Sequence, residues 1–297
     1  MLQILLCVLM NVGIFVCFRM FGVLKLNTLQ AIIFNYITCV ITGLLFIGDT
    51  SVVISALSFE DSWIFIALAL GGVFIGTFYL MAITTQKFSI TVSSISAKMS
   101  LVIPVLFSLL ILGIQSKDYT FLNYLGMTLA IVAILLSSYK EKKIKTEAIS
   151  GFELVLPLLV FVLGGIIDST INYTNHYFLT VKEEAIFPII VFGSASIIGF
   201  IILAIKRERI QLNNVIGGVA LGVVNYFSIY FLITALSAFQ NDGAIVYPLI
   251  NVGIILFGAI VSVSFFSEKL SKLNLAGLVL AMLSIALISY QEISNLL

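Results

Sequence analysis

The chain has 297 residues, of which 61% are hydrophobic and 10% charged, and its formal net charge is +1. Soluble domains usually carry about 25% charged residues, so this composition excludes an ordinary soluble protein and indicates a polytopic membrane protein. The low net charge, with no basic run interleaved with aromatic residues, excludes nucleic acid as a partner.

Hydrophobic runs about as long as a bilayer is thick predict ten membrane-spanning helices. The first run lacks a basic leading segment, so we interpret it as a retained span and not a signal peptide. The connections are too short for a soluble domain, and no GxxxxGK[ST] loop occurs, which excludes ATP-driven chemistry. The predicted spans are residues 2–18, 28–48, 62–85, 89–113, 120–138, 152–177, 185–205, 212–236, 243–266 and 273–290.

Small residues and cysteines in these spans are interpreted as packing features. Cys7, Cys17 and Cys39 lie inside predicted spans without CxxC spacing, which is typical of apolar filler and not of a metal or redox site. Pairs of small residues four apart predict close helix packing in the third and eighth spans. The pairs are Ala67 with Gly71 and Gly218 with Gly222, and Gly72 and Gly76 extend the first.

The fourth predicted span carries Lys98 just short of its middle. At helical spacing Ser94 and Lys98 share one stripe with Thr91, while the same side continues as plain hydrocarbon. Pro104 removes a backbone donor, which should leave the carbonyl of Ser100 without its usual helical partner. Lipid tolerates this only beside protein, hydroxyls or water, so we expect this helix to line a wet cavity.

The partner that we expect for Lys98 is Asp168, the other ionisable residue well inside a predicted span. Asp168 shares a helical face with Gly164, Asn172 and Asn175, so the sixth span presents a polar stripe to the interior. An intramembrane lysine costs a few kcal/mol unless it is paired. If the two pair in the empty protein, a substrate carboxylate could displace Asp168 and a proton could neutralise it. A structural ion pair is the alternative interpretation.

Other deep polar residues are amides, which clamp helices more often than they bind ligands. Asn251 is the exception that we favour, because it follows Tyr247 and Pro248 in the ninth span. His176 lies near a span end and is interpreted as interfacial. With one histidine and no HExxH or GxSxG motif, the chain is not expected to be an enzyme or to hold a metal or cofactor. The candidate substrate-binding residues are Lys98, Asp168, Asn172, Tyr247, Asn251 and Ser94, and the candidate clamps are Asn11, Asn35 and Asn225.

Sliding the chain against itself by 151 positions matches residues that apolar helices seldom match by chance. Each half holds an odd number of predicted spans, so the second copy must enter the membrane from the opposite side. We therefore predict an all-helical membrane protein with two inverted five-helix repeats, residues 1–145 and 146–297. The matches include Gly71 with Gly222, Tyr79 with Tyr230, Asn123 with Asn274, Gly126 with Gly277, and Tyr139 with Tyr290.

Basic residues gather on alternate connections that would share one face, which the positive-inside rule places in the cytoplasm. With ten spans, both termini would then lie outside, together with Asp49, Glu60, Asp61, Glu183, Glu184 and Glu292. The basic residues are Lys25, Lys87, Lys140, Lys142, Lys143, Lys145, Lys206, Arg207, Arg209, Lys269 and Lys272.

Two runs resemble the EamA-like branch of the drug/metabolite transporter superfamily. They are ITVSSISAKMSLVIPVLFSLLIL at 90–112 and GAIVYPLINVGIILFGAIVSVSFFSEKLSKLNLAGLVLAMLSIALI at 243–288. The second has the more specific features, a Glu268-Lys269-Leu270 turn followed by a span that opens around Gly277. The first half departs from the family pattern, with residues 115–118 reading QSKD where a Gly-Glu turn is usual and no Trp-Gly in the first span.

The resemblance implies a fold of two five-helix repeats whose fourth and ninth helices line a central cavity. It also implies export or exchange of small metabolites by alternating access, with both termini in the cytoplasm, which disagrees with the charge count. We thus expect a secondary transporter of an amino acid or organic acid in the cell membrane, with proton coupling as one route. The expected partners are the substrate and the lipid bilayer, and the chain would act as a monomer or weak homodimer. A non-transporting scaffold or receptor is the alternative.

Overall fold

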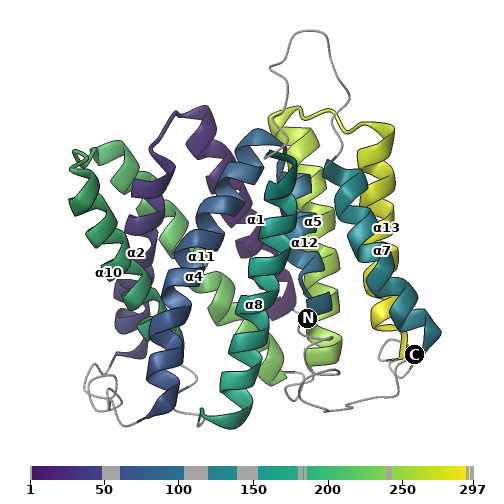
Figure 1. Ribbon diagram of the computed structural model, residues 1–297, viewed down its shortest axis with the longest axis horizontal. Coiled ribbons are helices and arrows are strands. Elements are labelled where there is room, and N and C mark those ends of the chain that lie inside the picture. The colour runs from purple at the N-terminus through teal and green to yellow at the C-terminus, as the bar shows by residue number, and fades with distance from the viewer. Residues whose placement is uncertain are drawn as a thin grey trace.

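The computed structural model describes residues 2–48, 61–103, 120–138, 153–179, 183, 186–238, 243–291 and 294. This part of the chain contains ten α-helices and one short 3₁₀ helix, and the long helices run side by side in one bundle (Figure 1). The helices are α1 (Leu2–Val23), α2 (Thr28–Ile47), α4 (Ser62–Lys87), α5 (Ile90–Met99), α7 (Phe121–Ser138), α8 (Leu156–Tyr177), α10 (Phe187–Lys206), α11 (Leu212–Ala238), α12 (Gly243–Phe266) and α13 (Lys272–Ile288), with the 3₁₀ helix Glu153–Val155 before α8.

Six of the described helices are long and apolar enough to cross a membrane, as expected of a polytopic membrane protein. Shorter apolar helical stretches, Phe121–Ser137, Leu156–Ile171 and Lys272–Ile288, lie in α7, α8 and α13. Nine of the ten predicted spans coincide with one helix each, because an uninterrupted apolar run in lipid can satisfy its backbone only as a helix. The six long helices are α1, α2, α4, α10, α11 and α12.

The fourth span differs from its prediction. Helix α5 ends at Met99, and Ser100 and Leu101 form a turn where a continuous helix was predicted. The carbonyl of Ser100 accepts the backbone N–H of Ile103 at 2.9 Å. Pro104 has no N–H to make the usual bond four residues on, and a tighter turn supplies a donor three residues on in its place. Pro104 itself lies outside the described residues.

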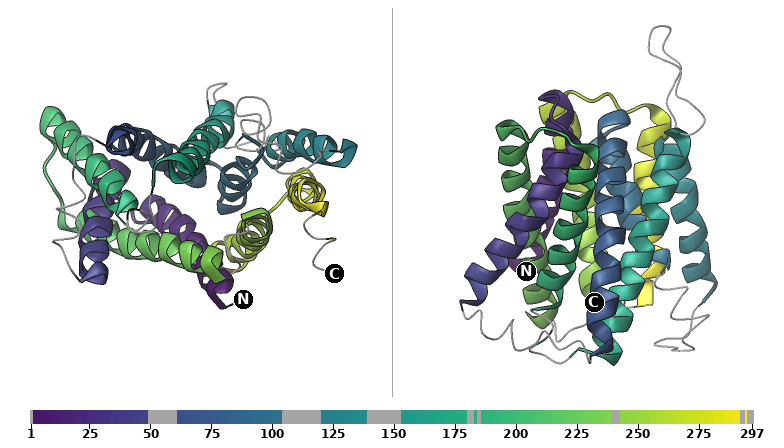
Figure 2. Two further views of the ribbon diagram at one scale, coloured as in Figure 1. Left: turned by 90° about the horizontal axis from the view of Figure 1, so that it is seen from below. Right: turned by 60° about the vertical axis from the view of Figure 1, so that its left-hand side comes forward.

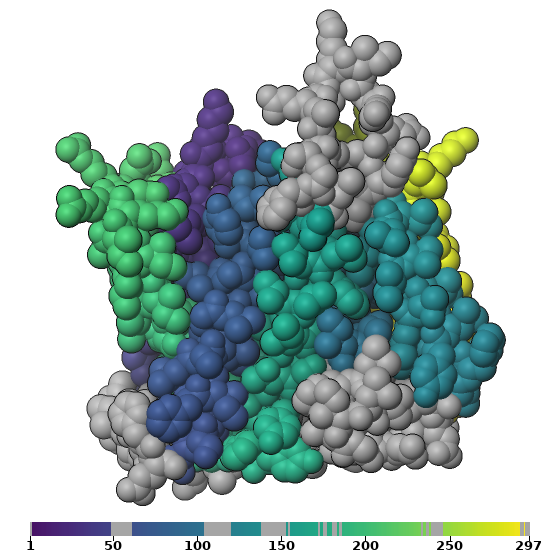
Figure 3. Space-filling view, viewed as in Figure 1, coloured from purple at the N-terminus to yellow at the C-terminus, as the bar shows by residue number. Residues whose placement is uncertain are grey.

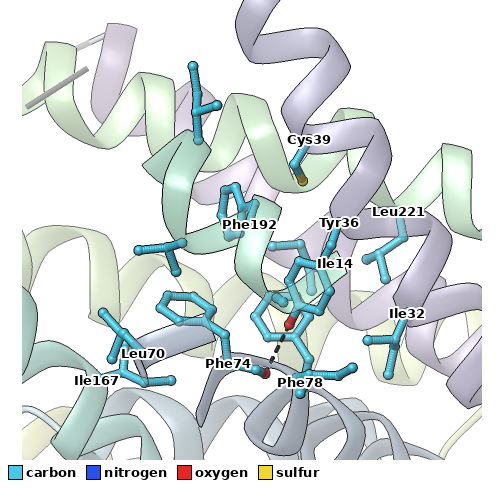
Figure 4. Close-up of a cluster of buried hydrophobic side chains, with 14 of the residues drawn as sticks. Ile14, Ile32, Tyr36, Cys39, Leu70, Phe74, Phe78, Ile167, Phe192 and Leu221 are labelled. Carbon is cyan, nitrogen blue, oxygen red and sulfur yellow. Dashed lines mark hydrogen bonds between the residues drawn. The ribbon is translucent and has the colours of Figure 1, made fainter. Parts of the chain in front are cut away.

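An aromatic core joins the helices on one side of the bundle (Figure 4). Tyr36 of α2 is fully buried, stacks on Phe192 of α10 with ring centroids 5.7 Å apart, and packs against Phe78 of α4. Its hydroxyl donates to the carbonyl of Phe74 at 2.9 Å, so the polar end of the ring is satisfied inside apolar surroundings. This contact fixes α2, α4 and α10 to one another.

Helices α7 and α13 form an antiparallel pair at the other side of the bundle (Figure 1). Near the start of α7, the amide of Asn123 donates to the carbonyl of Ile288 at the end of α13, at 2.8 Å. Near the start of α13, the amide of Asn274 donates to the carbonyl of Ser137 at the end of α7, at 2.5 Å. Each helix therefore binds the other's last turn through an asparagine at its own first turn.

Two glycines allow the close helix contacts that the small-residue pairs predict. A Cβ atom on Gly71 would lie 2.7 Å from the backbone nitrogen of Ala195, where α4 meets α10 (Figure 3). A Cβ atom on Gly222 would lie 2.7 Å from the carbonyl oxygen of Asn35, where α11 meets α2. These contacts confirm the predicted packing. Gly76 takes no part in it, because a Cβ there would meet nothing within 4 Å among the described residues.

The described connections that carry basic residues share one end of the bundle, drawn at the top of Figure 1 and here called the basic end. Asn27 in the α1–α2 connection donates to Glu208 in the α10–α11 connection at 2.7 Å. Arg19 near the end of α1 forms an ion pair with Glu268 in the α12–α13 connection. The other described basic residues of this end are Lys25, Lys87, Lys206, Arg207, Arg209, Lys269 and Lys272.

Replacing Gly71 with Ala should lower the free energy of unfolding by about 1–3 kcal/mol, because the added methyl meets backbone that cannot move aside. The matched control is Gly76→Ala in the same helix, where helix propensity predicts no loss or a gain of about 0.5–1 kcal/mol. Thermal unfolding in detergent, followed by circular dichroism, measures both. Equal melting temperatures for the two variants would contradict the packing described for α4 and α10.

Candidate functional site

Five helices enclose the middle of the bundle. Helices α1, α4, α8, α5 and α12 each pack against the next, and α12 packs against α1, which closes the ring. Figure 2 shows these helices nearly end-on, with α5 and α12 side by side. Polar side chains near the middle of these helices therefore meet inside the protein.

Lys98 lies in the last turn of α5 and is half-buried. Its ammonium nitrogen Nζ donates to Oδ1 of Asn11 on α1 at 3.2 Å. The amide of Asn251 on α12 donates to the backbone carbonyl of Lys98 at 3.4 Å. The end of α5 is thus held between α1 and α12 by amide side chains, and the ammonium has a neutral acceptor.

Asp168 lies in the middle of α8, and its Oδ2 accepts the hydroxyl of Ser100 at 3.1 Å. One turn earlier, a Cβ atom on Gly164 would lie 3.2 Å from the Ser100 side chain, so this face of α8 is turned toward α5. Asp168 is nevertheless exposed. The exposed Ile166 lies on the opposite side of the helix, so Asp168 is exposed on the side of α8 that faces α5.

The two charged residues do not form the ion pair that the sequence predicted. Among the described residues, no contact within 4.0 Å joins Lys98 Nζ to the carboxylate of Asp168. Lys98 and Ser100 are two residues apart and project from nearly opposite sides of α5, so the ammonium reaches α1 while the hydroxyl reaches α8. The charges remain near enough to interact electrostatically, and each has a neutral hydrogen-bond partner.

The remaining candidates divide into three groups. Tyr247 lies one turn before Asn251 on α12, is half-buried, and is within electrostatic reach of Asp168. Ser94 is fully buried, donates to the carbonyl of Thr91 and lies 3.3 Å from a Cβ atom built on Gly258, so it packs against α12. Asn172, Asn175 and His176 belong to α8, but their side chains lie outside the described ones.

Asn11 and Ser100 are the residues that sequence reasoning did not assign to the site. Asn11 was interpreted as a helix clamp, and the hydroxyl of Ser100 carried no signal apart from its place after the lysine. Asn35 and Asn225 do act as clamps, because the amide of Asn225 donates to Oδ1 of Asn35 at 3.1 Å between α11 and α2. Among the described residues, no group of three or more His, Cys, Asp or Glu could hold a metal ion.

A protein of Haemophilus influenzae whose description reads "Uncharacterized protein" is 30% identical to this chain over 274 residues, which is 89% of each protein. The chain belongs to the same family as that protein. A solved structure described as "Crystal structure of protein" has a fold similar to that of this chain. Its TM-score is 0.54 at 12% identity, and the match covers 96% of this chain and 98% of the solved one. No family model matches the chain.

Replacing Asn11 with Ala should lower the free energy of unfolding by about 1.5–3 kcal/mol, because the half-buried ammonium of Lys98 loses its acceptor. Asn213→Ala, at an exposed position in the first turn of α11, is the control and should change little. Thermal unfolding of both variants in detergent is the measurement. The double variant Asn11→Ala with Lys98→Met should recover part of the loss, since no ammonium is then left without an acceptor. A fully additive double variant would contradict the contact.

Proposed function

We propose that this protein is a secondary transporter that moves a small metabolite, an amino acid or an organic acid, across the cell membrane by alternating access, in export or exchange. The observation that carries the proposal is the half-buried Lys98 on α5 together with the exposed Asp168 on the side of α8 that faces α5. Ionisable residues inside membrane spans are costly, and they commonly mark substrate or proton pathways.

The inverted repeat in this proposal is supported by a repeated hydrogen-bond pattern. A shift of 151 positions exchanges Asn123 with Asn274 and Ser137 with Ile288. The bond from Asn123 to the carbonyl of Ile288 then maps onto the bond from Asn274 to the carbonyl of Ser137. An antiparallel pair of helices with reciprocal bonds is what two inverted repeats would give. On this proposal residues 1–145 and 146–297 are the repeats, and the ten helices are ten spans.

Helix contacts support the same pairing of halves. The shift of 151 positions carries α4 onto α11, and α2 and α10 are the second helices of the two halves. Helix α4 packs on α10 through Gly71, and α11 packs on α2 through Gly222, so each contact joins the third helix of one half to the second helix of the other. In inverted-repeat transporters the substrate binds near the midplane between the halves. On this proposal such a site would be formed by Lys98 of the first half with Asp168, Tyr247 and Asn251 of the second.

The charges of the cluster favour a substrate that carries a carboxylate. An ammonium that donates to a neutral amide oxygen gains a stronger, charge-assisted bond when a carboxylate replaces that oxygen. The carboxylate of Asp168 could bind a substrate amine or carry a proton, and either role requires that it not be permanently paired with Lys98. Tyr247 and Asn251 would supply neutral donors around the ligand.

Replacing Lys98 with Ala should abolish exchange in proteoliposomes, using as substrate a metabolite that raises the melting temperature of the parent protein by mass action. Lys98→Arg keeps the charge and should retain part of the exchange. Lys87→Ala removes a lysine from the basic end and should leave exchange near the parent rate. Full exchange by a folded Lys98→Ala protein would remove Lys98 from the site.

Replacing Asp168 with Asn separates the two roles of its carboxylate. If it carries a proton, exchange in the variant should no longer respond to a pH gradient, while exchange at equal pH continues. If it binds an amine, the variant should no longer exchange amino acids but should still exchange monocarboxylates. Counterflow of labelled amino acids and monocarboxylates, with and without a pH gradient, distinguishes these results. A variant that matches the parent in every condition would exclude both roles.

A further inference from the structure

A polar network ties the basic ends of three ring helices together. Arg19 near the end of α1 contacts Oε1 of Glu268 through its Nε atom at 3.1 Å. The same guanidinium donates through Nη1 to the carbonyl of Gln86, in the last turn of α4, at 3.2 Å. Glu268 follows α12 directly and also accepts the hydroxyl of Ser262 from the last turns of α12. One arginine therefore joins α1, α4 and the end of α12.

Gln86 extends the network to α2. Its side-chain amide donates to the carbonyl of Phe18 at 3.3 Å and to the hydroxyl of Thr28, the first residue of α2, at 3.0 Å. A Cβ atom on Gly22 would lie 2.9 Å from the Gln86 side chain, so the glycine leaves room for this approach. The network thus spans the ends of four helices at the basic end.

The network lies between the central cluster and the basic end. Along α1, Arg19 is eight residues beyond Asn11, which corresponds to about 12 Å of helix. Along α5, the first residue, Ile90, is also eight residues from Lys98. A solute that leaves the cluster toward the basic end within the ring must therefore pass the level of Arg19 and Glu268.

The chemistry of the pair suits a contact that opens. The side chain of Arg19 is 25% exposed and that of Glu268 is 9% exposed. Ion pairs withdrawn from water add little net stability, because desolvation offsets most of their attraction, and apolar residues would bind the helices at least as well. Separated charges can regain water, whereas separated apolar surfaces cannot. An ion pair is thus a poor permanent clamp and a good reversible one.

The backbone aims Glu268 back at α1. Ser267 has a φ of 51°, in the left-handed region that residues other than glycine seldom adopt. The backbone N–H of Glu268 then donates to the carbonyl of Ser262 at 3.2 Å. This turn directs the chain back along α12, and it places the Glu268 carboxylate against Arg19.

We propose that the Arg19–Glu268 pair is the gate that closes the central cluster from the basic end, and that the protein must separate this pair to open toward that side. The inference rests on the proposed transport function. Beyond that function, we assign a closed state to the protein and assign Arg19 and Glu268 as the residues that hold it closed. In the structure described here, the gate is closed.

The test measures how fast a cysteine in place of Asp168 reacts from the basic side, and it needs no substrate. Asp168→Cys is made in a Cys17→Ser background, where the native Cys7 and Cys39 are buried. A membrane-impermeant maleimide is added to membrane vesicles of each orientation, and a separate Lys206→Cys protein identifies which vesicles present the basic end. The expected result is slow labelling of Asp168→Cys from that end when Arg19 and Glu268 are unchanged.

Arg19→Ala or Glu268→Gln, added to this reporter, should raise the labelling rate from the basic side about tenfold or more. Glu268→Gln keeps the size of the side chain and its bond to Ser262, so it serves if Arg19→Ala does not fold. The double exchange Arg19→Glu with Glu268→Arg should restore slow labelling. Lys87→Ala is the control, because it removes an ion pair with Glu153 at the same end without touching the Arg19 network.

Equal labelling rates in the parent and in Glu268→Gln would overturn the gate. So would an increase in Lys87→Ala as large as in Glu268→Gln, because the effect would then belong to any charge lost at this end. Failure of the gate leaves exchange by the parent protein intact, whereas failure of the proposed function appears as an absence of exchange by the parent. The two failures are therefore distinguishable.

Discussion

The free-energy cost of holding the Lys98 ammonium away from bulk water constrains the centre of this protein. Lys98 is half-buried within a ring of five apolar helices, and its charge must be met by oxygen atoms or water. Asn11 supplies one oxygen from α1, and Asn251 holds the backbone of the lysine from α12. The turn after Met99 exposes the Ser100 hydroxyl to Asp168. The centre is polar because these helices bring amides, a hydroxyl and a carboxylate to the same level.

Contacts among the surrounding helices hold these polar residues in position. On one side the buried hydroxyl of Tyr36 binds α2 to α4. On the other, Asn123 and Asn274 bind α7 and α13 reciprocally. Where backbones approach most closely, glycine removes the side chain, as at Gly71 and Gly222. Helices in lipid gain little from burying apolar surface, so packing contacts and interhelical hydrogen bonds of this kind must supply the association.

Hydropathy predicts the helices well because lipid leaves the backbone few alternatives, and glycine spacing predicts the close contacts at Gly71 and Gly222. The partners of charged side chains were less predictable. Asn11 lies 87 residues before Lys98, and no periodicity links them. The first predicted span, residues 2–18, ends before Arg19, whereas α1 continues to Val23 and Arg19 forms an ion pair with Glu268. The hydrogen bond from Ser100 to Asp168 was also not predictable, because it depends on how the turn after α5 packs against α8.

The most direct test of this account is a structure of the protein in a lipid nanodisc with a transported metabolite bound, determined by electron cryomicroscopy. The account predicts a substrate carboxylate about 2.7–3.2 Å from Lys98 Nζ, in place of the Asn11 oxygen, within a polar space enclosed by the five helices. It would be contradicted by a ligand bound elsewhere, with the Lys98 ammonium directed into the acyl chains and no polar space beside it.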